Sequence, residues 1–263
     1  MVNADDFGFT PDVNEGIVEA HRHGILTATT LMANGEAFAD ALSRVQETPS
    51  LDIGCHLVLV GGNSVRTGQP LPPKVSALLG ALAGRQFSVY DELRAQIERI
   101  VRAGIQPTHL DTHKHTHLAP PVLDAVARLS EEFDIRWVRR PFDFPMEGSA
   151  APAAQRFLSR ALGFMRPWFH RVLEKRHCRT TDHFAGFQIT GRFRTEELVA
   201  LLRIIPEGST ELMCHPGKCG PALRQAPTRL KESREAELQA LVSDEARREI
   251  ERSGIELVSY REL

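Results

Sequence analysis

The chain has 263 residues, a formal net charge of −2 and 42% hydrophobic residues. This length fits one α/β domain of roughly 250 residues with a large core, and the near-neutral charge excludes a general electrostatic attraction to nucleic acid. The one basic stretch, Arg156 to Arg179, lacks an aromatic stacking pattern or a groove-reading motif. We therefore expect a helix with a solvated face there and no nucleic-acid partner.

The four cysteines have neither CxxC spacing nor the density of a disulfide framework. The chain starts without the basic and apolar segments of a secretory signal peptide, and it has no run of about 18 apolar residues that would span a membrane. We therefore expect free thiols, a cytoplasmic location and no stable membrane insertion.

Short apolar runs alternate with amphipathic segments along the first half of the chain. The pattern predicts strands at Val2 to Ala4, Thr27 to Ala33, Leu51 to Val60 and Pro107 to Thr112. It predicts helices from Thr10-Pro11 to Gly24, from Asp40 to Gln46 and from Ser88 to Gly104. The third strand is apolar almost throughout, which is typical of a strand buried on both faces.

The second half continues the alternation after an interruption. Helices are predicted from Pro120-Pro121 to Phe133 and at Thr195 to Ile205, Ser233 to Val242 and Asp244 to Ser253. Strands are predicted at Ile135 to Val138, Thr210 to Cys214 and Ile255 to Ser259. The pattern blurs between residues 142 and 192, where we expect a variable loop and helix insertion near the site.

Seven or eight strands separated by helices, without a break in composition, predict a single α/β domain with a parallel sheet over residues 1–263. A barrel fits this pattern. A doubly wound open sheet is the alternative, but no G-x-G-x-x-G motif follows a strand to support a nucleotide-binding version.

Polar residues of the kind used in catalysis occur in or after the predicted strands. They are Asp5, Asp6, His56, His113, Arg139 and His215. In a parallel-stranded barrel the carboxyl ends of all strands meet on one face, where catalytic groups gather. A buried strand histidine such as His56 requires a hydrogen-bond partner or a metal, although taken alone it is more often a core residue than a ligand.

The stretch Thr108-His-Leu-Asp-Thr-His-Lys-His-Thr-His117 strengthens the metal hypothesis. In an extended chain its alternate residues share one face, and these are His109, Asp111, His113, His115 and His117. An extended chain would place His113 and His115 about 6.5 Å apart, whereas a helical chain would bring His113 and His117 together. Either arrangement favours imidazole ligands, which with one carboxylate suit a divalent ion.

The adjacent carboxylates Asp5 and Asp6 can divide two tasks between them. One can coordinate the ion while the other accepts a proton from metal-bound water as a general base. His215, which precedes Pro216-Gly217, is either a turn residue or a general acid, because imidazole titrates near neutral pH. Asp111 is suited to orient a ligand imidazole.

Together these motifs resemble the YdjC-like carbohydrate deacetylase family, which includes chitooligosaccharide deacetylases and proteins associated with hopanoid biosynthesis. The resemblance covers nearly the whole chain and ends in a Ser259-Tyr-Arg segment. Four motifs carry it: Asn3-Ala-Asp-Asp-Phe-Gly8, Gly54-Cys-His-Leu57, Pro107-Thr-His-Leu-Asp-Thr-His-Lys-His-Thr-His117 and Glu211-Leu-Met-Cys-His-Pro-Gly217.

The resemblance implies an irregular TIM-like (β/α) barrel that uses one divalent metal ion, Mg²⁺ or Zn²⁺. By motif, Asp6, His56 and His113 correspond to the metal ligands and Asp5 to the catalytic base. His115 and His117 then lie nearby as supporting or substrate-facing groups. Arg139 resembles an arginine that steadies the base. A homodimer is also an expectation from the resemblance.

The expected function is a metal-dependent hydrolase that removes an acetyl group from an N-acetylated sugar or sugar conjugate. Asp5 would be the general base and His215 the general acid. Two alternatives are a metal-dependent phosphoesterase on a His-rich barrel and a catalytically inactive carbohydrate-binding relative. A phosphoesterase would more naturally hold two or three ions and several basic groups, and an inactive relative should lack an intact base.

Overall fold

A curled, seven-stranded parallel sheet forms the centre of the molecule in a computed structural model that describes residues 1–146 and 152–263. The strand order is β5-β4-β3-β2-β1-β7-β6, and every neighbouring pair is parallel. The strands are β1 (Val2–Phe7), β2 (Ala28–Leu31), β3 (Asp52–Leu57), β4 (His109–Thr112), β5 (Trp137–Val138), β6 (His183–Ala185) and β7 (Thr210–Cys214).

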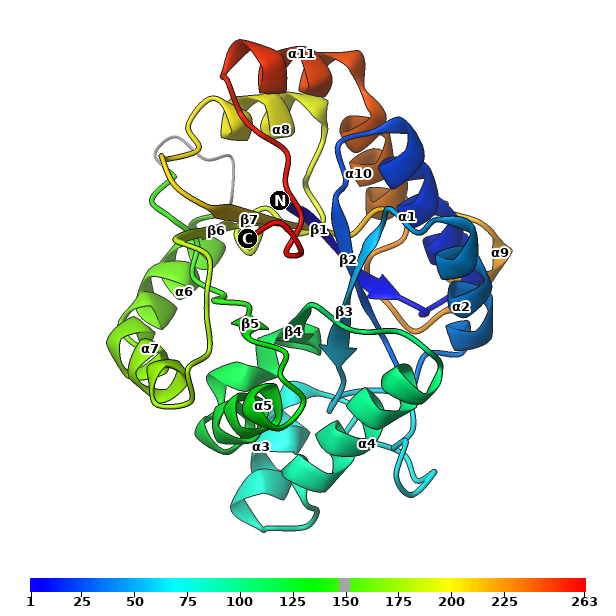
Figure 1. The fold of residues 1–263 in the computed structure, drawn as a ribbon, viewed down its shortest axis with the longest axis vertical. Coiled ribbons are helices and arrows are strands. Elements are labelled where there is room, and N and C mark those ends of the chain that lie inside the picture. The colour runs from blue at the N-terminus through cyan, green and yellow to red at the C-terminus, as the bar shows by residue number, and fades with distance from the viewer. Residues whose placement is uncertain (147–151) are drawn as a thin grey trace.

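Helices surround this sheet, as Figure 1 shows. The helices of the first half are α1 (Pro11–His23), α2 (Phe38–Glu47), α3 (Val75–Ala83), α4 (Val89–Arg102), the 3₁₀ helix η1 (His113–Leu118) and α5 (Pro120–Glu132). Those of the second half are α6 (Ala153–Gly163), α7 (Arg166–Glu174), α8 (Thr195–Leu202), α9 (Pro221–Gln225), α10 (Glu232–Val242) and α11 (Asp244–Arg252). In the described part, no helix has both the length and the apolar character needed to cross a membrane.

The curled sheet and its surrounding helices agree with the predicted α/β domain, but the sheet forms a half-barrel. Within residues 1–146 and 152–263, no ladder joins the edge strands β5 and β6. A parallel bridge between Trp137 and Arg179 connects the β5 edge to the segment before β6. The sheet therefore curls as the predicted TIM-like barrel requires, but no strand ladder among the described residues closes it into a full barrel.

The end of β1 is irregular, and this irregularity sets the directions of the two neighbouring carboxylates. Ala4 pairs with Thr29 but Phe7 pairs with Leu31, so β1 contains one more residue than β2 over this interval. Asp6 takes a positive φ of 71°, a left-handed conformation that aspartate adopts more readily than most side chains. Such a bulge re-aims side chains at the rim of a sheet.

The predicted final strand, Ile255 to Ser259, is wrong. This segment has no strand pairing and leads to Tyr260, which is buried against Met1 and Ala28 where the first strands begin. The Tyr260 N–H donates to Asp52 Oδ2 over 2.9 Å, and its ring stacks on His109 with 3.9 Å between ring centroids. The C-terminal segment thus packs across the amino ends of the strands and does not extend the sheet. Tyr260 and Arg261, which pairs with Asp52 Oδ1 at 3.0 Å, hold it there.

The region between residues 142 and 192 contains more regular structure than expected. It holds two helices, α6 and α7, and the edge strand β6. Residues 147–151 of this insertion lie outside the described residues. Helices α3 and α9 were also not predicted from the sequence.

Candidate active site

Asp6, His56 and His113 bring three ligand atoms together at the carboxyl rim of the sheet. Asp6 Oδ1 lies 3.3 Å from His56 Nε2 and 3.2 Å from His113 Nδ1, and the two nitrogens are 3.2 Å apart. Ligands about 2.0–2.2 Å from one divalent ion are separated by about 3.0–3.4 Å from each other. Apart from these two imidazoles, the buried Asp6 Oδ1 has no partner among the described residues. This donor set therefore fits a divalent ion.

His56 is oriented toward this triangle by a carboxylate. Its Nδ1 lies 2.7 Å from Asp111 Oδ1, and Thr30 Oγ1 donates to Asp111 Oδ2 over 3.1 Å. A proton on Nδ1 leaves the Nε2 lone pair for a metal, which is a common arrangement of metal-bound histidines. Burial opposes the charged imidazole, but the Asp111 carboxylate outweighs burial and raises the pKa of His56 to about 10.

His113 reaches the triangle because the chain turns sharply at the end of β4. Lys114 and His115 have positive φ angles of 55° and 51° and interrupt the helical geometry of η1. Neither the extended chain nor the regular helix considered for the histidine tract is present. The ligand atom of His113 is Nδ1, and its side chain is 24% exposed, so this side of the site is open to solvent.

The second oxygen of Asp6 pairs with Arg234, a residue that the sequence analysis missed. Arg234 Nη2 donates to Asp6 Oδ2, and the arginine side chain is 1% exposed. The sequence feature that could have revealed Arg234 is its position in α10. Arg234, Glu237, Leu238 and Leu241 follow the spacing of one helical face. Charged residues at core positions of such a face indicate a buried polar role.

Asp5 is held by Arg139 through two parallel hydrogen bonds of 2.8 and 2.7 Å. Arg139 also contacts Asp111 Oδ2 at 2.6 Å and Glu211 Oε1 at 2.7 Å. Burial opposes ionisation of Asp5, but the Arg139 charge outweighs it and holds the pKa of Asp5 well below its usual range. Asp5 is therefore an ionised carboxylate in a fixed orientation. Glu211, buried in β7, was not assigned a role from the sequence.

A second group, Asp5, His56 and Asp111, is also compact enough to hold an ion. Both of its carboxylates already bind Arg139, whose positive charge occupies the space between them. The group of Asp6, His56 and His113 is the better candidate, because no cation outside the group binds Asp6 Oδ1 in the described structure.

His215 lies beside Asp5 at the end of β7. Its Nε2 is 3.9 Å from Asp5 Oδ2, and its Nδ1 is 3.9 Å from Glu237 Oε2. Its backbone N–H donates to Glu237 over 2.5 Å. Burial lowers the pKa of His215 to about 4, although Asp5 and Asp6 act in the opposite direction. The imidazole is therefore neutral near pH 7.

The remaining two histidines of the tract differ in their surroundings. His117 uses both ring nitrogens within the fold, because Nδ1 contacts Thr112 Oγ1 at 2.5 Å and Nε2 contacts the Arg139 carbonyl at 3.1 Å. His115 packs near Phe187, with 5.6 Å between the ring centroids, and its buried Nδ1 has no hydrogen-bond partner in the described structure. Of these two histidines, His115 is the one with a ring nitrogen that has no hydrogen-bond partner among the described residues.

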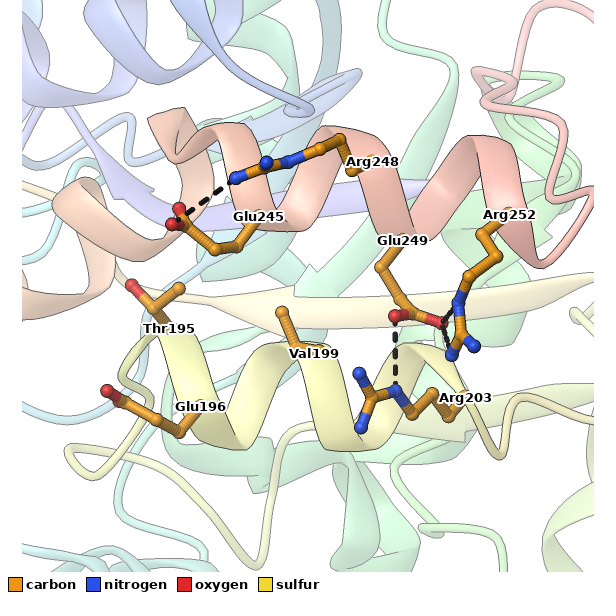
Figure 2. Close-up of a pocket in the computed structure, with 8 residues that line it drawn as sticks. All are labelled: Thr195, Glu196, Val199, Arg203, Glu245, Arg248, Glu249 and Arg252. Carbon is orange, nitrogen blue, oxygen red and sulfur yellow. Dashed lines mark hydrogen bonds and ion pairs between the residues drawn. The ribbon is translucent and has the colours of Figure 1, made fainter.

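A surface groove of about 650 Å³ lies between α8 and α11, and none of its lining residues belongs to the Asp/His group. Figure 2 shows that its side chains pair across or along the helices: Glu249 with Arg203 and Arg252, and Glu245 with Arg248. We interpret this groove as a solvated, charged helix surface.

The fold and the site define an α/β protein with a candidate metal centre at the carboxyl rim of a curled parallel sheet. Residues 1–252 match the family described as YdjC-like protein. The chain belongs to this family, which confirms the resemblance seen in the sequence.

Relatives cover the full length of the chain. A carbohydrate deacetylase of Brevibacillus brevis is 33% identical over 274 residues, covering 100% of this chain and 98% of the relative. A carbohydrate deacetylase of Geobacillus stearothermophilus is 31% identical over 271 residues, covering 100% and 97%. A crystal structure from Enterococcus faecalis, whose name refers to cellobiose-phosphate cleavage, has a TM-score of 0.77 at 24% identity and covers 100% and 97%. This last similarity shows a shared fold.

Proposed function

We propose that the chain is a metal-dependent carbohydrate deacetylase that hydrolyses the acetamide of an N-acetylated sugar or sugar conjugate. The main support is the triangle of Asp6 Oδ1, His56 Nε2 and His113 Nδ1 beside the fixed carboxylate of Asp5. The names of the full-length relatives support the same substrate class.

Asp6, His56 and His113 would hold one divalent ion, Mg²⁺ or Zn²⁺. Such an ion supplies Lewis acidity toward an amide carbonyl and lowers the pKa of water. Arg234 balances the charge of Asp6, and Asp111 keeps the His56 lone pair available. A divalent ion would have access through the partly exposed side of His113.

Asp5 is the proposed general base. Arg139 holds both carboxylate oxygens, so the group stays ionised and its orientation is fixed before the substrate arrives. A base with such a low pKa retains a proton poorly. The nearby His215 Nε2, 3.9 Å from Asp5 Oδ2, offers a group that can accept that proton in turn.

His215 is the proposed general acid for the departing amine. Because burial lowers its pKa to about 4, its imidazole starts the cycle neutral. The proton that it donates must therefore be one that the reaction releases, passed on from Asp5. His115, whose side chain is partly exposed beside Phe187, is a proposed substrate contact, whereas Asp111 and His117 support the residues around them.

Neither alternative function has a comparable observation in its favour. A phosphoesterase with two ions would need a second donor set, and the only other group found in the described residues shares His56 and is bound to Arg139. An inactive relative would not need an intact Asp5.

Acetate release provides the test. The metal-loaded protein should release acetate from at least one substrate in a panel of N-acetylated mono- and oligosaccharides and lipid-linked sugars, and a chelator should stop the release. Restoring Zn²⁺ or Mg²⁺ should restore it. No release from any substrate by a protein that has bound one ion per chain would refute the proposal.

A further inference from the structure

Helix α6 exposes most of its apolar residues to solvent. Ala154, Phe157, Leu158, Ala161 and Phe164 follow the spacing of one helical face, and all five are exposed. Phe157 is 76% exposed and Phe164 is 89% exposed. A helix on the surface of a protein normally turns such a stripe toward the core, whereas α6 turns it toward solvent.

The other side of α6 is held to the protein by polar contacts and by Leu162, which packs partly buried against the hydrophobic core. Ser159 Oγ donates to Asp143 Oδ2 over 3.3 Å, and Gln188 Nε2 donates to Ser159 Oγ over 3.3 Å. Asp143 also accepts the backbone N–H groups of Phe187 and Gln188 at 3.1 and 2.9 Å. These contacts orient the helix with its apolar stripe outward, and no residue of α6 is buried.

The segment that contains α6 and α7 is strongly basic. Residues 152–179 include seven Lys or Arg side chains and one carboxylate, Glu174, although the whole chain has a net charge of −2. Arg156 and Arg160 are both exposed and lie one helical turn apart, next to the apolar stripe. Exposed aromatic rings and positive charges therefore occur on the same surface.

An anionic lipid bilayer matches both properties of this surface. Interfacial helices place Phe and Leu at the boundary of headgroups and acyl chains, while their Arg and Lys side chains contact anionic headgroups. A second copy of the chain is a poorer match. A two-fold dimer through α6 would bring two segments of the same positive charge together, and their repulsion would oppose the contact.

We propose that α6 is a peripheral membrane-docking surface, with its Phe157, Leu158 and Phe164 side chains at the headgroup level of an anionic bilayer. Docking would also bring the rim of the candidate active site toward the lipid, because Asp143 links α6 to Phe187, which packs near His115. This proposal does not depend on the reaction assigned to the site.

Vesicle co-sedimentation of the full chain tests the proposal. The parent protein should bind vesicles of phosphatidylcholine with about 30% phosphatidylglycerol at least tenfold more tightly than vesicles of phosphatidylcholine alone. The double variant Phe157→Ser/Phe164→Ser should lose about tenfold or more of the binding to anionic vesicles. Arg160→Glu should weaken it about fivefold or more, and added salt should act in the same direction.

Leu79→Ser is the matched control, because Leu79 is 51% exposed on the separate helix α3. It should bind vesicles like the parent. Because Phe157 and Phe164 are exposed, the double variant should keep the parent's circular dichroism and thermal midpoint. The proposal is overturned if the parent does not bind anionic vesicles at low salt, or if the double variant binds like the parent. It is also overturned if the parent is a dimer that the double variant converts to a monomer without any change in vesicle binding.

Discussion

Arg139 and Asp5, separated by 134 positions in the chain, form a buried, bidentate ion pair with N–O distances of 2.8 and 2.7 Å. The guanidinium also binds Asp111 and Glu211, so one cation balances three carboxylates that converge from β1, β4 and β7. The same residue therefore stabilises the fold at the rim of the sheet and fixes the orientation of the proposed base.

Replacing Arg139 tests this double role. Arg139→Gln leaves three buried carboxylates without their cation, so we expect a loss of about 3–5 kcal/mol in the free energy of unfolding. Arg139→Lys keeps the charge but lacks the planar guanidinium that binds two carboxylate oxygens at once. It should therefore be more stable than Arg139→Gln but have little more activity. Urea denaturation and acetate release measure the two effects. Arg176→Gln, at a surface pair with Glu131, is the control and should change stability by at most about 1 kcal/mol.

Removing a metal ligand should abolish tight metal retention. His56→Ala and His113→Ala each delete one of three protein donors, so elemental analysis after gel filtration should find less than one ion per chain in a folded protein. Asp111→Asn removes only the group that orients His56 and should weaken binding about 10–100-fold. His23→Ala, at an exposed position in the last turn of α1, should retain the ion. Full retention by both ligand variants would exclude this site.

The two adjacent carboxylates should give different phenotypes. Asp5→Asn should keep the ion but lower kcat by about 10²- to 10⁴-fold, because it removes the proposed base. Asp6→Asn should mainly lower metal affinity. Titration with the metal and steady-state kinetics on the same preparations separate these outcomes, and an exchange of the two phenotypes would reverse the assigned roles.

Metal affinity should increase with pH. In the ion-free protein, Asp111 raises the pKa of His56 to about 10, so His56 is protonated at neutral pH and must lose a proton when an ion binds. Below pH 10 this one group should lower the apparent affinity about tenfold for each unit of decrease in pH. Calorimetry in two buffers with different ionisation enthalpies should detect the released proton. A pH-independent affinity would show that His56 does not bind the ion.

His215→Ala should lower kcat most for substrates with poor leaving groups. An amine must be protonated to depart, whereas a phenolate from an aryl acetate need not be. We expect a larger loss of kcat on an N-acetyl sugar than on an aryl acetate, provided that the parent protein hydrolyses both. An equal loss on both substrates would indicate that His215 positions the substrate instead.

The sequence alone determined the alternation of strands and helices and most of the candidate site. Helix and strand periods depend on neighbours a few residues apart, so Pro11–His23 and Thr210–Cys214 were predicted close to their observed limits. Asp6, His56 and His113 were recognised because each lies in a short motif at or near a strand end. The chemistry of these residue types is also independent of the fold.

Only the tertiary structure decided the features that depend on distant contacts. Arg234 meets Asp6 across 228 positions, and Tyr260 is bound by Asp52 across 208, so no local pattern indicated the first partner or excluded a final strand at Ile255 to Ser259. The turn after Thr112 selected Nδ1 of His113 as the ligand atom where spacing left two geometries open. Periodicity likewise describes an apolar stripe on α6 without saying which way it faces. In the folded chain the opposite side of α6 contacts the protein through Ser159, which donates to Asp143, and through Leu162, so the stripe faces outward.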